Sequence, residues 1–243
     1  MKSLCIIQAR MGSTRLPGKV LKEVMGKPLI AHTIGRLKKC RGIDHIILAT
    51  SALPQDAPLL DAAKKESVEG FAGSENDVLD RYYQAALKYK PQIVIRCTGD
   101  CPMFDPVVTD LVITTHFKKG SDYTSNSVTR SYPRGMDTEV MNYPVLERIA
   151  KEAKDEFSRE HVTPYIYRHP EFFKVEQVVA PPELFDPGLR LCVDTLEDFE
   201  LIRRIFEALY PQNPYFTVGE VLELVKRHPE LREINAHVEQ KHA

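Results

Sequence analysis

The sequence predicts an α/β domain with a mostly parallel central sheet between two layers of helices. Short uninterrupted apolar runs, 46–49 and 93–95 among them, are typical of parallel strands that are buried on both faces. Segments in which apolar residues recur at helical spacing separate these runs, so that strands and helices alternate. The 243 residues contain no repeat, low-complexity stretch or flexible linker. We therefore expect a single domain spanning 1–243.

The first half of the chain carries the clearest alternation. A strand at 4–7 leads into a loop rich in glycine and cations, and Pro28 suits the first position of the helix that follows. Asp105 before Pro106 is a helix-start signal. The expected elements are strands at 4–7, 43–50, 67–72 and 92–97 and helices at 29–40, 57–66, 77–89 and 105–117.

The second half is less regular. Thr195 with Asp198 has the spacing of a capping box, and so has Thr217 with Glu220, which places two helix starts. The tail from Pro229 is polar, and we expect it to be peripheral. The expected elements are β structure at 122–126, strands at 136–142, 172–179 and 189–193, and helices at 145–153, 158–167, 195–210 and 217–228.

Composition narrows the class of protein. The formal net charge of −1 argues against binding to nucleic acid or to an anionic membrane. No apolar run approaches the ~18 residues of a membrane-spanning helix. The chain enters its first strand too early to leave room for a signal peptide, so we expect a cytoplasmic protein. Five scattered cysteines indicate buried, reduced thiols rather than a zinc site.

The loop after the first strand concentrates positive charge. Arg10, Arg15 and Lys19 fall within ten residues, together with two glycines and two hydroxyl side chains. Such a loop can turn backbone N–H groups toward an anion, and the cations add charge-assisted bonds. The pattern predicts a phosphate-rich ligand, with a solvated basic turn as the alternative. It is not a Walker A loop, because Gly18 and Lys19 are followed by Val20.

Asp100 lies just beyond the strand expected at 92–97. Open α/β sheets place their ligand chemistry beyond the carboxyl ends of the strands. A carboxylate beside a triphosphate suits Mg²⁺. The alternative is an Asx-type turn after Gly99.

The loop residues carry a resemblance to a known family. Residues 7–19 fit the pattern [IV]-x-A-R-x-x-S-x-R-[LF]-P-x-K of cytidylyltransferases that make CMP-activated acidic sugars. This variant resembles the branch named after spore coat polysaccharide biosynthesis protein F, and 99–102 and 193–198 resemble two further motifs. The resemblance implies the nucleotide-diphospho-sugar transferase fold, a Rossmann-like three-layer sandwich. It also implies a small β/helical excursion at about 121–180 for acceptor binding and dimerisation.

The resemblance implies an activity as well. CMP would pass from CTP to a 2-keto-3-deoxy type acidic sugar, pyrophosphate would leave, and the product would feed cell-surface polysaccharide biosynthesis. The implied enzyme is a homodimer whose cofactor is Mg²⁺, held by Asp100 and Asp194. The alternative is that Asp194 acts only as a helix cap. The implied residues are Arg10, Lys19 and Asp100 for catalysis, and Ala9, Arg10, Gly12, Ser13, Arg15, Lys19, Arg81, Thr98 and Gly99 for the nucleotide.

Acceptor binding is expected in the middle of the chain. Arg134 and Asp137 flank a Gly-Met pair and are expected to bind a sugar carboxylate and a hydroxyl, with Arg159 and His161 as neighbours. The alternative for each of these residues is a surface salt bridge or a satisfied polar group. One departure concerns 77–81, where octulosonate-specific relatives carry Gly-Thr-Asp-Arg.

Three rival functions use related folds. A uridylyl- or thymidylyltransferase acting on a sugar 1-phosphate would open with Gly-x-Gly-Thr-Arg, where this chain has Ala9 and Arg10. A glycosyltransferase would carry an Asp-x-Asp pair, which the sequence lacks. A non-catalytic nucleotide-binding protein would bind CTP without releasing pyrophosphate.

Overall fold

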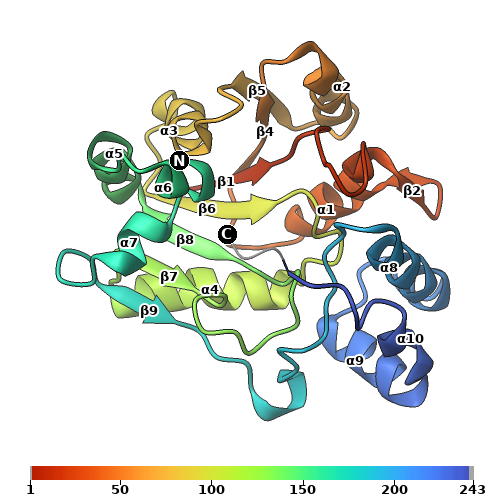
Figure 1. Ribbon diagram of the computed structural model, residues 1–243. Helices are drawn as coiled ribbons and strands as arrows, with labels where there is room; N and C mark the ends of the chain where they lie inside the picture. Colours follow the sequence, from red (N-terminus) through yellow and green to blue (C-terminus); the bar gives the residue numbers. More distant parts are fainter. Residues whose placement is uncertain (1, 241–243) are drawn as a thin grey trace.

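The computed structural model describes residues 2–240, and its centre is a seven-stranded sheet. The strand order is β5 (Glu69–Gly73), β4 (His45–Ser51), β1 (Ser3–Gln8), β6 (Ile93–Thr98), β8 (Glu139–Asn142), β7 (Tyr123–Ser125) and β9 (Val175–Gln177). Pairing is parallel except where β8 lies antiparallel between β6 and β7. The predicted mostly parallel sheet is confirmed. The strands of the expected excursion extend this same sheet (Figure 1).

Helices cover both faces and make three layers (Figure 1). One core contains side chains of α1 (Leu29–Leu37), α2 (Ala57–Lys65), α4 (Pro106–Lys119), α8 (Leu196–Leu209) and α9 (Val218–Arg227). The other contains those of α3 (Val78–Leu87), α5 (Tyr143–Glu152), α7 (Pro164–Arg168) and Val162, which follows α6 (Glu156–His161). Successive residues of β1 alternate between the two cores, which explains why its apolar run is uninterrupted.

Strand direction brings distant loops to one edge. The carboxyl ends of β1, β4, β5 and β6 lie at the same edge because these strands are parallel. The antiparallel β8 begins there, with Glu139 opposite Arg96. The chain just before β8 therefore reaches the edge where Asp100 follows β6.

Two glycines let these loops approach closely. A Cβ on Gly99 would lie 2.8 Å from the Cβ of Ala9, so the loops after β1 and β6 touch only because Gly99 has no side chain. Gly135 has a φ of 104° and would place a Cβ 2.7 Å from the carbonyl carbon of Leu191. Only glycine suits both the φ and the contact.

Some expected elements differ from the structure. The run 189–193 forms no strand within the described residues; a single bridge joins Arg190 to Arg134, and the apolar side chains of this irregular segment are buried in the core that contains α8 and α9. Burial in a loop gives the same apolar signal as a strand. The helix expected at 158–167 is two helices, because Val162 has a φ of 73° and Pro164 opens α7. Pro28 precedes α1 and ends a small hairpin, β2 (Glu23–Val24) with β3 (Lys27–Pro28).

Contrary to the expectation from sequence, the C-terminal tail is not peripheral. Helix α10 (Glu230–Glu233) buries Leu231, and Asn235 beyond it is only 4% exposed. Short 3-10 turns η1 (Lys19–Leu21), η2 (Pro54–Asp56) and η3 (Pro182–Leu184) complete the chain. The capping boxes of Thr195 and Thr217 are confirmed.

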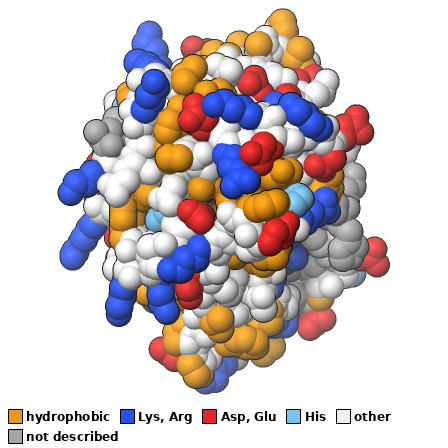
Figure 2. Space-filling view, turned by 90° about the vertical axis from the view of Figure 1, so that its left-hand side faces the viewer, with side chains coloured by type: hydrophobic (Ala, Val, Ile, Leu, Met, Phe, Trp, Pro, Cys, Tyr) orange, Lys and Arg blue, Asp and Glu red, His pale blue; other side chains and the backbone are white. Residues whose placement is uncertain are grey.

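The surface of the described residues carries mixed charge on the face that Figure 2 shows, where acidic, basic and apolar side chains are interspersed. None of the helices in residues 2–240 is long and apolar enough to cross a membrane. All five cysteines are buried and have free thiols, as predicted.

Candidate active site

The loop after β1 is held in a fixed shape. The carboxylate of Asp56, only 1% exposed, accepts the backbone N–H of Met11 at 2.6 Å. The Ser13 hydroxyl accepts the N–H of Leu16 at 3.3 Å. Within residues 2–240, no acceptor lies within bonding distance of the backbone N–H groups of Gly12 and Thr14. A rigid loop with unused N–H groups suits an anion.

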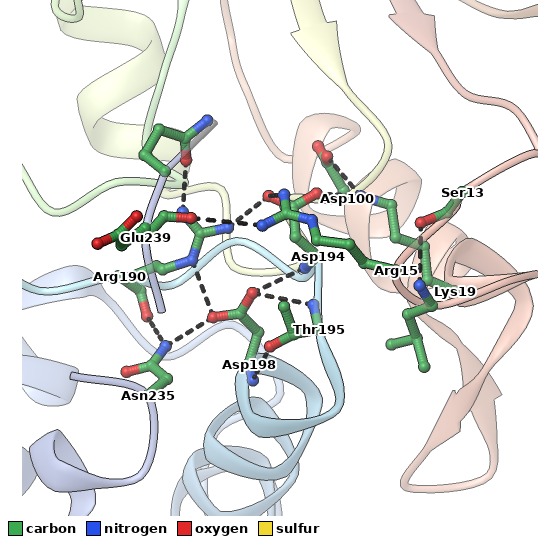
Figure 3. A network of polar contacts seen from close by, with 12 residues as sticks. Ser13, Arg15, Lys19, Asp100, Arg190, Asp194, Thr195, Asp198, Asn235 and Glu239 are labelled. Carbon is green, nitrogen blue, oxygen red and sulfur yellow. Dashed lines mark hydrogen bonds and ion pairs between the residues drawn. The ribbon is translucent and has the colours of Figure 1, made fainter. Parts of the chain in front are cut away.

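Lys19 leaves this loop at Gly18, whose φ of 66° turns the chain into η1. Its side chain is buried, and Nζ donates to Asp100 Oδ2 at 2.9 Å and to Asp194 Oδ1 at 2.7 Å (Figure 3). Burial alone would lower the pKa of Lys19, but the two carboxylates outweigh it and raise the pKa above the usual value. Lys19 is therefore a fixed cation at neutral pH.

Asp100 and Asp194 meet although they are far apart in sequence. The N–H of Val193 donates to the carbonyl of Asp100 at 2.8 Å and ties their two loops together. Burial would raise the pKa of both carboxyls, but Lys19 outweighs it and lowers both pKa values. Both are ionised at neutral pH. The Asp100 carboxylate binds the Lys19 ammonium, not a backbone N–H as an Asx-type turn requires.

The donor set fits a divalent metal. Two carboxylates converge from separate loops, and within the described residues no cluster of three or more His, Cys, Asp or Glu side chains is placed to hold a metal. Mg²⁺ commonly takes one or two protein carboxylates and completes its shell with water and substrate phosphates. Asp100 and Asp194 match that pattern, and a protein cage built for a tightly held metal would need more ligands.

Two arginines approach Asp194 from opposite sides. Arg15, from the loop, lies 3.0 Å from Asp194 Oδ2. Arg190 pairs with the same oxygen and also with Asp198 (Figure 3). Sequence reasoning did not identify Arg190, although an arginine inside the apolar run 189–193 is a signal of a buried charge with a specific partner.

Arg10 and Arg81 form a second group of cations. Arg81 is 2% exposed, its Nη1 donates to the carbonyl of Ser74 at 3.0 Å, and its Nε has no acceptor. Burial lowers the pKa of Arg81, and the nearby charge of Arg10 lowers it further. Within residues 2–240 neither arginine has a carboxylate partner. An anionic ligand would supply the partner that the buried Arg81 lacks, with the exposed Arg10 nearby to bind the same anion.

The remaining nucleotide candidates lie at the carboxyl ends of β1 and β6. Thr98 pairs with Gln8 across β1 and β6, and the N–H of Gly99 donates to the carbonyl of Gln8 at 2.8 Å. Ala9 packs where a side chain on Gly99 would stand. The structure therefore brings the predicted nucleotide residues to one edge of the sheet.

The acceptor candidates are divided between two places. Asp137 is bound by both terminal nitrogens of Arg130, at 2.7 and 2.8 Å, while Arg134 has no side-chain partner in the described part of the chain. Both lie just before β8, at the edge that carries Asp100.

The other two acceptor candidates lie on α6, beside α3. Arg159 donates to the Asp77 carboxylate and to the carbonyl of Ala150. His161 packs on Phe157, with ring centroids 4.7 Å apart, and burial lowers its pKa.

Comparison with known proteins shows which proteins resemble this chain in sequence and in fold. A family model described as Cytidylyltransferase matches residues 4–225. Spore coat polysaccharide biosynthesis protein SpsF of Bacillus subtilis is 37% identical over 232 residues, which are 93% of this chain and 95% of that protein. A solved cytidylyltransferase from Leptospira borgpetersenii serovar Hardjo-bovis is 30% identical, with a TM-score of 0.91 and 100% coverage of both chains. CMP:2-keto-3-deoxy-manno-octonic acid synthetase complexed with CTP is 20% identical; its TM-score of 0.65, over 86% of this chain and 99% of that one, shows likeness of fold.

Proposed function

The chain belongs to the cytidylyltransferase family, and from this premise we propose that it transfers CMP from CTP to an acidic sugar of the 2-keto-3-deoxy type, with release of pyrophosphate. The observation that carries the proposal is the Lys19 ammonium held between Asp100 and Asp194 beside a loop with unused N–H groups. This arrangement combines anion binding with a pair of metal-ligating carboxylates at the ligand-binding edge of the sheet.

The residues divide the work of the reaction. Arg10 and Arg81 bind phosphate oxygens of CTP, and the N–H groups of the loop add further donors. Lys19 and Arg15 stabilise the charge that develops on the α-phosphate and on the leaving pyrophosphate. Asp100 and Asp194 would hold Mg²⁺, which when bound would neutralise phosphate charge and lower the pKa of the acceptor hydroxyl.

The acceptor is expected beside this group. The Arg134 side chain has no partner within residues 2–240 and precedes β8 at the strand edge, which supports a role for it in binding the sugar carboxylate. Asp137, held in orientation by Arg130, accepts a sugar hydroxyl. Arg159 and His161 would contribute from α6.

The biological setting follows from the same premise. We propose a cytoplasmic homodimer that uses 121–180 for its interface and acceptor site and serves cell-surface polysaccharide biosynthesis, with a spore coat as one setting. Analytical ultracentrifugation tests the dimer.

The reaction is tested by measuring pyrophosphate release with each of the four nucleoside triphosphates and Mg²⁺, against a panel of keto-acid sugars and sugar 1-phosphates. Release with CTP and a keto acid only is the expected result. Preference for UTP or dTTP with a sugar 1-phosphate would refute the proposal in favour of a uridylyl- or thymidylyltransferase. Tight CTP binding without release on any acceptor would favour a nucleotide-binding protein.

A further inference from the structure

Asp198, at the third position of α8, makes more bonds than a helix cap needs. Its carboxylate is fully buried, and Oδ2 accepts the N–H of Thr195 at 3.1 Å, which completes the capping box. Oδ2 also accepts the N–H of Asp194 at 2.9 Å. Oδ1 accepts Arg190 Nε and Asn235 Nδ2, both at 2.9 Å (Figure 3). Three of these four bonds hold groups outside the helix cap.

Two of the bonds fix Asp194 in position. One holds its backbone N–H directly. The other holds Arg190, whose Nη2 pairs with the Asp194 carboxylate. Asp198 therefore sets both the main chain and the carboxylate of Asp194, and any shift of Asp198 would reach Asp194 by two routes.

Asn235 completes this arrangement from the far end of the chain. It is 4% exposed, and its Nδ2 donates both to Asp198 Oδ1 and, at 3.0 Å, to the carbonyl of Arg190. One amide group thus joins the two residues that orient Asp194. Removing it would leave two buried acceptors short of a donor and would let Arg190 move.

We propose that Asn235 is a positioning residue for Asp194, acting through Asp198 and Arg190, so that the C-terminal segment is part of the metal-binding site. The inference rests on the proposed function in one respect, because it takes Asp194 as a metal ligand. Groups that orient metal ligands typically change metal affinity or activity about 10- to 100-fold when they are removed.

The test compares Asn235→Ala with Asn142→Ala. Asn142 is a matched control, because its side chain also makes two hydrogen bonds, to His116 and to the carbonyl of Ser121. It lies opposite Ile93, at the other end of β6 from Asp100. For each protein we would titrate Mn²⁺ calorimetrically in the presence of a non-hydrolysable CTP analogue. The thermal midpoint and the Mg²⁺ concentration for half-maximal turnover would be measured alongside.

Asn235→Ala is expected to weaken Mn²⁺ binding about 10-fold and to raise the Mg²⁺ requirement by a similar factor. Asn142→Ala should lower the thermal midpoint and leave Mn²⁺ affinity unchanged. Asn235→Asp keeps the shape, loses the donor and places a carboxylate against Asp198, so it should weaken Mn²⁺ binding at least as much.

Mn²⁺ affinity that is equal in the parent and in both Asn235 variants would overturn the proposal. Failure of the proposed function looks different. A parent that releases no pyrophosphate, while its Mn²⁺ affinity still depends on Asn235, would refute the reaction and keep the positioning role.

Discussion

The cations of the site fall into two groups that differ in what balances their charge. Lys19 and Arg15 each contact a carboxylate, at 2.7–3.0 Å. Arg10 and Arg81 contact no carboxylate within residues 2–240, although Arg81 is almost completely buried. Burying a charge without a paired carboxylate is costly, so Arg81 is expected to be maintained for a ligand; Arg10 is exposed and adds positive charge beside it.

From this difference we expect the two groups to have separate tasks. Around Lys19 the carboxylates and cations already balance one another, which suits a site where a metal and charged phosphates come and go together. Arg10 and Arg81 present net positive charge, which suits the binding of a triphosphate before any metal contact. Removing a member of each group should therefore have different consequences, which the following variants are chosen to separate.

The largest effect is expected for Asp100→Asn, in the group around Lys19 where carboxylates and cations balance in charge. It removes the proposed metal ligand and an anionic partner of Lys19 while preserving the shape of the side chain. Turnover should fall on the order of 10³-fold, because charge stabilisation in the transition state is lost. Initial-rate assays over a Mg²⁺ series would measure this, with circular dichroism to confirm the fold.

Asp110→Asn is the matched control for that substitution. The Asp110 carboxylate accepts the backbone N–H groups of Arg41 and Gly42, both at 2.9 Å, and takes no part in the site. It should keep parental turnover. Full activity of Asp100→Asn with Mg²⁺ would remove Asp100 from the metal site.

Arg81→Met tests the second group, Arg10 and Arg81, which contacts no carboxylate within residues 2–240. CTP affinity should fall about 10- to 100-fold, the equivalent of one or two charge-assisted hydrogen bonds. The free energy of unfolding without ligand should stay within about 1 kcal/mol of the parent, because an unpaired buried charge contributes little stability. Calorimetric CTP titration with EDTA, and denaturant unfolding, would measure the two quantities.

Arg36→Met is a suitable comparison for Arg81→Met, because Arg36 is 1% exposed and bonds to backbone carbonyls of Phe104 and Phe216. Arg36→Met should lower the free energy of unfolding and leave CTP affinity at the parental value. If Arg81→Met binds CTP as tightly as the parent, the assignment of Arg81 to the nucleotide is wrong.

Lys19→Met should change how stability depends on pH. In the parent, Lys19 outweighs burial and depresses the pKa of Asp100 and of Asp194. These carboxylates therefore contribute stability above about pH 4, which is lost as the pH falls through their folded pKa values. In the variant, burial and the charge of Asp194 raise the pKa of Asp100, so protonation on acidification relieves its unpaired charge, whereas Arg15 and Arg190 still lower the pKa of Asp194.

The free energy of unfolding of Lys19→Met should consequently be about 2 kcal/mol lower than that of the parent at pH 7. This figure is reduced to allow for the partial exposure of Asp100 and Asp194. The difference should narrow as the pH approaches 4. Urea unfolding at several pH values would measure it. A difference that stays constant from pH 7 to pH 4 would contradict the coupling of Lys19 to these carboxylates.

The half of the site that local sequence encodes was predictable. The loop at 7–19 and Asp100 follow directly from buried strands, and the order of strands and helices places them at one edge. Asp194 was identified by the resemblance and by a strand expected at 189–193, and the described residues form no strand there, so only the resemblance remains as a signal. Its contact with Lys19 spans 175 positions, and no local pattern encodes such a distance.

The other half depends on long-range burial. In the sequence, Arg190 interrupts an apolar run, Asp198 fits a helix cap and Asn235 belongs to a polar tail. Their roles arise only when three separate segments pack together and each buried polar group must find a partner. Arg159 shows the same limit: its charge suggested an acceptor contact, and the fold supplies Asp77 as a partner.

The smallest effect is expected at Arg159, a cation that pairs with the Asp77 carboxylate and belongs to neither group. Arg159→Ala should cost about 1 kcal/mol of stability, because the pair with Asp77 is partly exposed. Asp77→Ser removes the same partner and keeps a cap for α3, whose Asp80 N–H now bonds to Asp77 at 2.9 Å. Both variants should therefore lose similar stability in thermal unfolding. If Arg159 also binds the acceptor, only Arg159→Ala will raise the acceptor KM; an equal KM in the two variants would confine Arg159 to holding α6 against α3.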